Sequence, residues 1–366
     1  MEELKKKGLR AYFSLKNLVD INELSINSIL KLFDALILPV VSYACQIWFY
    51  KTAFVNQVSS GNFENKPCES IKKIVLDPIE RLHIKFLKWT LGVHKKTSNV
   101  FCWGDTGRTP LLQKISKQAT DYFERLEIMN VTKKDCLVRH AFAEQKALIL
   151  PWYQSMSKII NISKSATEDH GNHTPSQGLL VKDELGKRFE QMWTKVAEAS
   201  PKLRFYFAVK KKPGFETYLK IKNRQIRKSI ARLRSSSHRL NIETARYSNT
   251  TQRASMSPST PGNIAWKQCC KVCCSEDTEL LLQQPFAGPP LIEDEQHVLA
   301  TCPAYHHLRL QLCDHVKSAV LAWDERLVTL FEEPYILEFG TFINRIFRIR
   351  FPKTKARIKK DITTRT

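Results

Sequence analysis

The sequence predicts a mainly α-helical protein with three parts: an N-terminal helical module, a basic helical arm and a small C-terminal domain stabilised by zinc. Apolar residues recur every three or four positions near the N-terminus, which is the spacing of one helix face. Lysine and arginine dominate residues 202–246, and cysteines and a histidine gather between positions 269 and 302. With 366 residues and 43% hydrophobic content, the chain is long enough for several cores.

The first segment, Leu4 to Trp48, reads as two helices. Pro39 is expected to stop the second helix, because proline lacks the N–H that a helix interior needs, and Val40 to Trp48 is expected to be a buried continuation. The polar, glycine-containing stretch from 56 to 67 reads as a loop. The helical pattern is carried by Leu15, Leu18, Ile26, Ile29, Leu30, Phe33, Leu36 and Ile37.

A strong helix is expected from Pro78 to Leu91, because proline favours the first helical position and Gly92 favours the end. Residues 97–108, rich in Gly, Asn and Asp, read as a loop, and a further helix should run from Pro110 to Met129. Together these segments predict a helical module over residues 1–160, an ordinary domain size.

A linker is expected over residues 161–180, because the stretch is polar and has little to bury. The basic helical arm should follow over 181–247. Within it, Leu219, Ile226, Ile230 and Leu233 share one helical face, opposite the cations at 224, 228 and 232. Such a helix can dock on a core and meet phosphates at once. The predicted phosphate contacts are Lys210, Lys211, Lys212, Arg224, Arg227, Lys228, Arg232 and Arg234.

A second linker, 248–264, precedes a predicted zinc-knuckle domain at 265–310. Cys270 and Cys273 form a Cys-x-x-Cys pair, and His297 with Cys302 forms a second close pair. Thiolates and imidazole suit tetrahedral Zn²⁺, so zinc is the predicted cofactor. Four of the ten cysteines lie within six residues, so alternative pairs remain open at this stage: Cys269 with Cys273, and Cys270 with Cys274.

Residues 311–366 should form C-terminal helices and a basic tail. One helix is expected from Tyr305 to Trp323, further helical segments up to Phe351, and a frayed tail from Lys353.

Charge indicates the partner. The chain has 58 Lys and Arg against 36 Asp and Glu, a formal charge of +22, which points to RNA or DNA. A membrane partner and a small-molecule substrate are not expected, and the oligomeric state is not predicted. The longest apolar run, Leu36 to Phe49, is too short and broken to span a bilayer. Scattered cysteines favour an intracellular, reducing compartment, and the basic runs make the nucleus a candidate.

No catalytic motif is expected to act here. The chain has no phosphate-binding glycine loop, no nucleophile elbow, no His-Glu-x-x-His and no pair of adjacent aspartates. The acids Glu293, Asp294 and Glu295 beside His297 are interpreted as zinc-site partners, with Glu293 or Glu295 accepting the second N–H of the histidine.

Three segments resemble the C-terminal part of the long open reading frame of non-LTR (LINE-type) retrotransposons, downstream of the reverse transcriptase palm. Residues 32–48 are similar to the thumb helix of that family, with its Pro, Tyr and Trp. Residues 232–247 are similar to its "lR-x-S-x-H-x-L-x-I-E-x-G-R-Y" pattern. Cys270, Cys273, His297 and Cys302 match its "C-x-x-C…E-D-E-x-H-x-L-x-x-C-P-x-Y" pattern.

The resemblance implies a thumb-like N-terminal module and a Cys-Cys-His-Cys zinc knuckle. It also implies a fragment that binds RNA or DNA without polymerase or nuclease activity of its own. Ala44 and Ala245 replace glycines of the family pattern, Gln46 replaces an acid, and Leu280 to Leu291 lengthens the ligand loop. These departures keep two alternatives open: a non-catalytic protein-interaction module, or a non-functional remnant of a decayed element.

Overall fold

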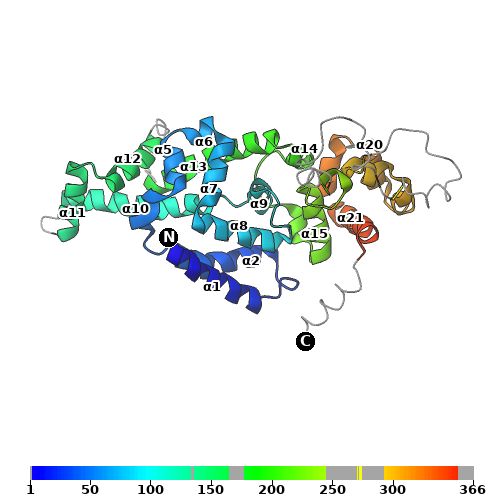
Figure 1. Ribbon diagram of the computed structural model, residues 1–366, viewed down its shortest axis with the longest axis horizontal. Helices are drawn as coiled ribbons and strands as arrows, with labels where there is room; N and C mark the ends of the chain where they lie inside the picture. Colours follow the sequence, from blue (N-terminus) through cyan, green and yellow to red (C-terminus); the bar gives the residue numbers. More distant parts are fainter. Residues whose placement is uncertain are drawn as a thin grey trace, which may run out of the picture. The chain divides into compact units, whose positions relative to one another are not determined.

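A computed structural model describes residues 2–132, 136–164, 177–244, 270, 272–273 and 292–352. The prediction of a mainly α-helical protein is confirmed, and the described residues contain no β-strand (Figure 1). The chain divides into two compact units. Unit 1 comprises residues 1–90, 98–201 and 211–216, and unit 2 comprises 91–97, 202–210 and 217–366. Each unit is therefore made of three separate stretches of the sequence, and the units do not follow the linear order of the predicted domains.

Unit 1 is a helical assembly whose long helices α10 and α13 pack side by side, with α12 also against α13 (Figure 1). Its α-helices are α1 (Glu2–Leu18), α2 (Ile26–Leu32), α3 (Leu38–Val41), α4 (Cys45–Trp48), α5 (Ala53–Ser59), α6 (Asn62–Asn65), α7 (Pro67–Leu76), α8 (Pro78–Leu91, whose last residue is in unit 2), α9 (Asn99–Thr106), α10 (Leu111–Thr132), α11 (Leu137–Ala147), α12 (Pro151–Lys164) and α13 (Gln177–Ala199).

The core of unit 1 is aromatic. Phe33 and Phe86 approach with ring centroids 4.6 Å apart, and Trp103 meets Phe189 edge-on at 5.8 Å. The buried Glu80 carboxylate accepts the backbone N–H of Leu111 at 2.6 Å, which fixes the start of α10 against α8. The helices Pro78–Leu91 and Leu111–Thr132 agree with the predicted pattern.

Pro39 does not stop the second helix. A π-turn, η1 (Phe33–Ile37), joins α2 to α3, and the helical course continues to Val41. The wider turn changes the backbone hydrogen-bond register just before Pro39, so the helix tolerates the hydrogen bond that proline cannot donate. Helix α3 ends at Val41, and Ala44, whose backbone φ of 50° is left-handed, separates it from α4. A 3-10 turn, η2 (Phe49–Lys51), follows α4.

Two predicted loops are helical, and those predictions are wrong. Residues 56–67 contribute to α5, α6 and the first residue of α7, because Phe54, Val58 and Phe63 bury their side chains beneath a polar outer face. Residues 97–108 contain α9, in which Trp103 is fully buried and Gly107 ends the helix with φ 62°. In both cases burial of a few apolar side chains outweighs the polar composition.

The predicted linker 161–180 is helical at both ends, since α12 reaches Lys164 and α13 begins at Gln177. Val181, Leu185 and Phe189 are buried at four-residue spacing, which extends α13 toward its N-terminus. Residues 165–176, the second predicted linker and the insertion 280–291 lie outside the described residues.

Unit 2 is built around the pair α15 and α21 (Figure 1). Gly340 of α21 lies so close to Ile226 and Ile230 of α15 that an added Cβ would approach their carbons to 2.7 and 2.6 Å. The described elements of unit 2 are α14 (Arg204–Val209), η4 (Thr217–Lys220), α15 (Arg224–Arg234), η5 (His297–Thr301), η6 (Pro303–Tyr305), α19 (His306–Arg309), α20 (Asp314–Ala322), η7 (Glu325–Phe331) and α21 (Ile336–Arg350), and η3 (Pro201–Leu203) enters this unit.

The predicted helix from Tyr305 to Trp323 is broken. A short helix ends at Arg309 and α20 begins at Asp314, because Cys313 donates its backbone N–H to Glu338 at 2.7 Å and the side chain of Arg309 turns inward to backbone carbonyls. Helix α21 ends at Arg350, in agreement with the expected helical course to Phe351; the predicted basic tail from Lys353 lies outside the described residues.

Within the described residues, no single helix has the length and apolar character to cross a membrane. By length and composition alone, the bent pair Ile26–Val41 and Cys45–Lys51, which meet at 63°, passes that test.

Candidate metal centre

The four predicted metal ligands come together in unit 2. Cys273 lies in a turn with Val272, His297 opens the π-turn η5, and Cys302 directly follows it. One ligand atom from each residue lies within 4.8 Å of all the others, and all four residues are buried. Cys269 and Cys274, the alternative ligands, lie outside the described residues.

The π-turn explains how His297 and Cys302 face the same point. In an α-helix, residues five apart point about 140° away from each other. Here the N–H of Cys302 donates to the carbonyl of His297 at 2.7 Å, a bond that spans five residues and widens the turn. This wider turn brings the two side chains to one side, and Pro303 then ends it.

The donor set fits a tetrahedral metal ion. Cys273 Sγ lies 3.4 Å from His297 Nε2, whereas ligand atoms around tetrahedral Zn²⁺ are expected about 3.5 to 3.8 Å apart. Three thiolates and one imidazole leave no ligand position for water, which is the pattern of a structural rather than a catalytic site. If these four buried side chains held no ion, their sulfur and nitrogen atoms would be crowded together without a common partner.

Proximity also shifts the pKa of Cys270, Cys273 and His297. Hydrogen bonds from Cys273 and Cys302 hold the pKa of Cys270 far below its usual range. Burial alone would lower the pKa of His297, but the neighbouring Cys270 and Cys302 thiolates outweigh it and raise that pKa to about 10. A metal ion must therefore displace a proton from the imidazole, so metal binding should release protons.

The partners of His297 differ from those predicted. Its Nδ1 lies 3.3 Å from the Thr301 hydroxyl, and its backbone N–H donates to Asp294 at 2.8 Å. Neither Glu293 nor Glu295 contacts the imidazole, because other groups occupy both carboxylates.

Glu293 and Glu295 instead connect the metal segment to the rest of unit 2. Glu293 accepts two hydrogen bonds from the guanidinium of Arg350, one of them at 3.0 Å, and one from the backbone of Asn241 at 2.8 Å. Glu295 lies 3.0 Å from His238 Nε2 and 2.9 Å from Arg204. These contacts give the two acids a structural role.

Glu295 is held in its charged form. Burial opposes ionisation, but the hydrogen bond and charge of His238, together with Arg204, lower its pKa to about 2. Ser236 also donates to this carboxylate, at 3.0 Å. Its oxygens are therefore used in fixing three neighbours and are not presented to a substrate.

Several predicted phosphate contacts are buried. Arg234 is fully buried, with its guanidinium 4.9 to 5.6 Å from the ring centroids of Tyr206, Tyr218 and Phe331. Arg227 donates to the backbone carbonyls of Ile221 and Lys222. Lys210 is also buried, at 8% exposure. Arg227 and Arg234 are therefore enclosed within unit 2, whereas the prediction placed them at a phosphate-binding surface.

The other predicted cations lie nearer the surface. Arg224, Lys228 and Arg232 are half-buried on α15, opposite the buried Ile226, Ile230 and Leu233, as the helical spacing predicted; Leu219 is buried too but belongs to η4. Lys211 and Lys212 are exposed but belong to unit 1.

A second cationic cluster in unit 2 was not predicted. Burial and the charges of Lys95, Lys96, Lys202 and Arg239 lower the pKa of His94. We call these five residues the His94 cluster. The run His94-Lys95-Lys96 after Gly92 was the available sequence signal, but nothing in the sequence joins it to Lys202 and Arg239.

Fold and site together define a helical protein with a buried three-cysteine, one-histidine group that can hold a metal ion. No protein-family model, curated protein or solved structure matches the chain.

Proposed function

We propose that the ion held by Cys270, Cys273, His297 and Cys302 is zinc and that its role is structural. Full burial and the closed donor set support this role, because such sites contribute their binding energy to folding. Zinc with three thiolates carries a net charge of −1. Arg309, which donates to the Cys302 carbonyl at 2.5 Å, places a positive charge beside the site.

We infer that unit 2 binds RNA or DNA through the His94 cluster. The observation that carries this inference is the convergence of four lysines and arginines on one histidine. Burial is the largest cause of the lowered pKa of His94, and the charges of the four cations add to it. Four cations around one residue create a positive electrostatic potential, and such a potential attracts a phosphate backbone. Lys228 extends the cluster, since its side-chain carbons lie 3.3 Å from an added Cβ at Gly92.

By its resemblance to LINE-type elements, the chain is proposed to be a non-catalytic nucleic-acid-binding fragment of a retrotransposon reverse transcriptase, with the nucleus as a candidate location. The order of the three similar segments supports this origin. Glu293 and Glu295 are paired with Arg350 and Arg204, which favours a non-catalytic role for the metal segment.

The zinc proposal is tested by elemental analysis and circular dichroism of the full chain. Wild type should contain about one zinc per chain, and His297→Ala and Cys302→Ala should lose both the metal and part of the helical signal. Cys313→Ala is the matched control, because Cys313 is exposed and away from the four ligands. A folded wild-type protein without zinc would refute the proposal.

The binding proposal is tested by fluorescence anisotropy with labelled single-stranded RNA and duplex DNA over a salt series. Arg239→Gln and Lys202→Gln should weaken binding and each reduce the slope of log K against log salt by about 0.7 to 0.9. Arg326→Gln removes the same charge from an exposed residue that pairs with Asp324, and should have little effect. Equal losses in all three variants would mean that net charge alone, and not the His94 cluster, attracts nucleic acid.

A further inference from the structure

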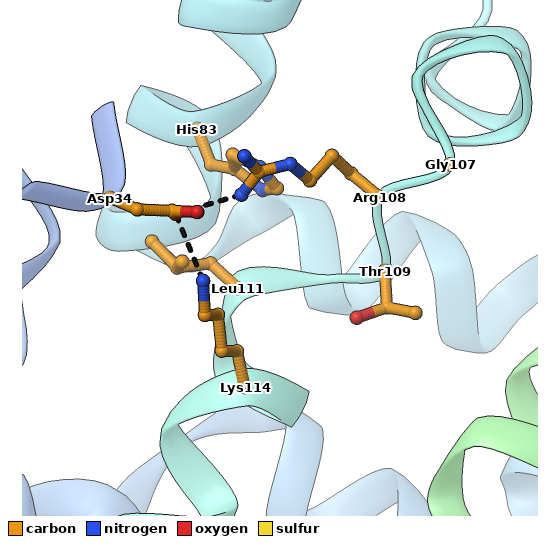
Figure 2. Close-up of a pocket in the computed structure, with 7 residues that line it drawn as sticks. All are labelled: Asp34, His83, Gly107, Arg108, Thr109, Leu111 and Lys114. Carbon is orange, nitrogen blue, oxygen red and sulfur yellow. Dashed lines mark hydrogen bonds and ion pairs between the residues drawn. The ribbon is translucent and has the colours of Figure 1, made fainter. Parts of the chain in front are cut away.

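Unit 1 contains a cavity of about 250 Å³ at the start of α10, and its lining includes none of the predicted metal ligands or phosphate contacts. Asp34 enters it from η1, His83 from α8, and Arg108 and Thr109 from the segment between α9 and α10 (Figure 2). The remaining lining residues are Gly107, Leu111 and Lys114.

Two cations meet one carboxylate in this cavity. Arg108 donates to Asp34 Oδ1 at 2.7 Å, and the Lys114 ammonium lies 3.0 Å from the same oxygen. Figure 2 shows the two side chains reaching Asp34 from different elements. Burial opposes the ionisation of Asp34, but the two cations outweigh it and keep its pKa below the usual range. The three groups therefore carry a net charge of +1.

Thr109 adds a hydroxyl to the wall, whereas His83 turns its Nδ1 to Glu80 at 3.0 Å. Arg108 is only 18% exposed and also donates to the backbone carbonyl of Leu30 at 3.0 Å, whereas Lys114 is 44% exposed at the mouth of the cavity. A single ion pair would need one cation. The second one, Lys114, adds a charge that a bound anion would neutralise.

We propose that this cavity binds a phosphate group, through Arg108, Lys114 and Thr109. An arginine fork and a lysine ammonium are the usual partners of phosphate oxygens, which only accept hydrogen bonds. The volume admits a phosphate with a small attached group. The group is supplied either by a free phosphorylated molecule or by one phosphodiester of a nucleic acid chain, and the test separates these sources.

The test is calorimetric titration of the full chain with inorganic phosphate, and with a dinucleoside monophosphate, which has a single phosphodiester. All variants are made in the Arg239→Gln protein, so that the His94 cluster contributes less to the measured phosphate binding. Lys114→Gln should weaken binding roughly tenfold, the value of one charged hydrogen bond. Lys117→Gln, on the same helix but paired with Asp121, is the matched control and should bind normally.

The Asp34→Asn variant should change the affinity for phosphate in the opposite direction. Removing the competing carboxylate should tighten phosphate binding severalfold while circular dichroism stays unchanged. A purely structural role of the ion pairs predicts no binding in wild type, or equal binding by Lys114→Gln and Lys117→Gln, and either result would overturn the proposal. If Asp34→Asn does not fold, the lysine pair alone decides. Binding of the dinucleotide but not of inorganic phosphate would identify nucleic acid as the source, and binding of inorganic phosphate but not of the dinucleotide would identify a free phosphate group.

Discussion

Glu295 holds the guanidinium of Arg204 at 2.9 Å, two residues before the metal-facing His297. Arg204 begins α14, far from Glu295 in the sequence, so this ion pair joins the metal segment to a helix of the predicted basic arm. The same carboxylate reaches His238 and Ser236, which follow α15. Residues 202–210 and 217–244 of the predicted basic arm therefore belong to the same structural unit as the metal segment.

Glu295→Gln should destabilise unit 2 by about 3 kcal/mol, because it leaves buried partners of a lost charge without compensation. Urea unfolding followed by circular dichroism measures the change. Zinc content should stay near wild type, since none of the four ligands is altered. Glu325→Gln, at an exposed acid, is the control and should change stability by less than about 0.5 kcal/mol. Equal stabilities of the two variants would contradict the network.

Arg234→Met should lower the free energy of unfolding by about 2 kcal/mol, because a desolvated cation is lost from three aromatic faces. Nucleic-acid affinity of the folded variant should not change. Arg232→Met, a half-buried neighbour on the same helix, should show the reverse: nearly normal stability and weaker, less salt-dependent binding. Thermal unfolding and anisotropy separate the two effects, and a binding defect in Arg234→Met would restore it as a phosphate contact.

These two arginines show what the sequence can and cannot predict. The helical spacing correctly divided α15 into an apolar face and a cationic face, because both faces are local properties of one helix. It could not reveal that Arg234 points into a cage made by Tyr206, Tyr218 and Phe331, since those residues come from three separate elements. Long-range packing of this kind leaves no periodic signal.

The metal ligands were predictable for the complementary reason. His297 and Cys302 are five residues apart, and a single π-turn brings them together, so their spacing is a local signal. Glu293 and Glu295 were assigned correctly to the surroundings of the site but to the wrong partners, because Arg350, Asn241 and His238 reach them from distant parts of unit 2.

Nucleic-acid affinity should rise as pH falls from about 7.5 to about 5.5, by two- to threefold, through His94. In the free protein, burial and the charges of Lys95, Lys96, Lys202 and Arg239 lower the pKa of His94. A bound phosphate backbone offsets those charges and raises that pKa, so the complex binds more protons than the free protein. His94→Asn should flatten the pH profile measured by anisotropy. An unchanged profile would place the nucleic acid away from this cluster.

Gly340→Ala should destabilise the protein by about 1 to 3 kcal/mol, the usual cost of overpacking. The new Cβ would lie 2.6 Å from Ile230 and 2.7 Å from Ile226, so α15 and α21 would have to separate. Gly186→Ala is the control. It lies inside α13 with its nearest neighbour, Gln113, at 3.6 Å, and should stabilise the protein by up to about 1 kcal/mol because alanine favours helix. Urea unfolding of both variants measures the contrast, and a neutral Gly340→Ala would mean that the α15–α21 contact is looser than the structure indicates.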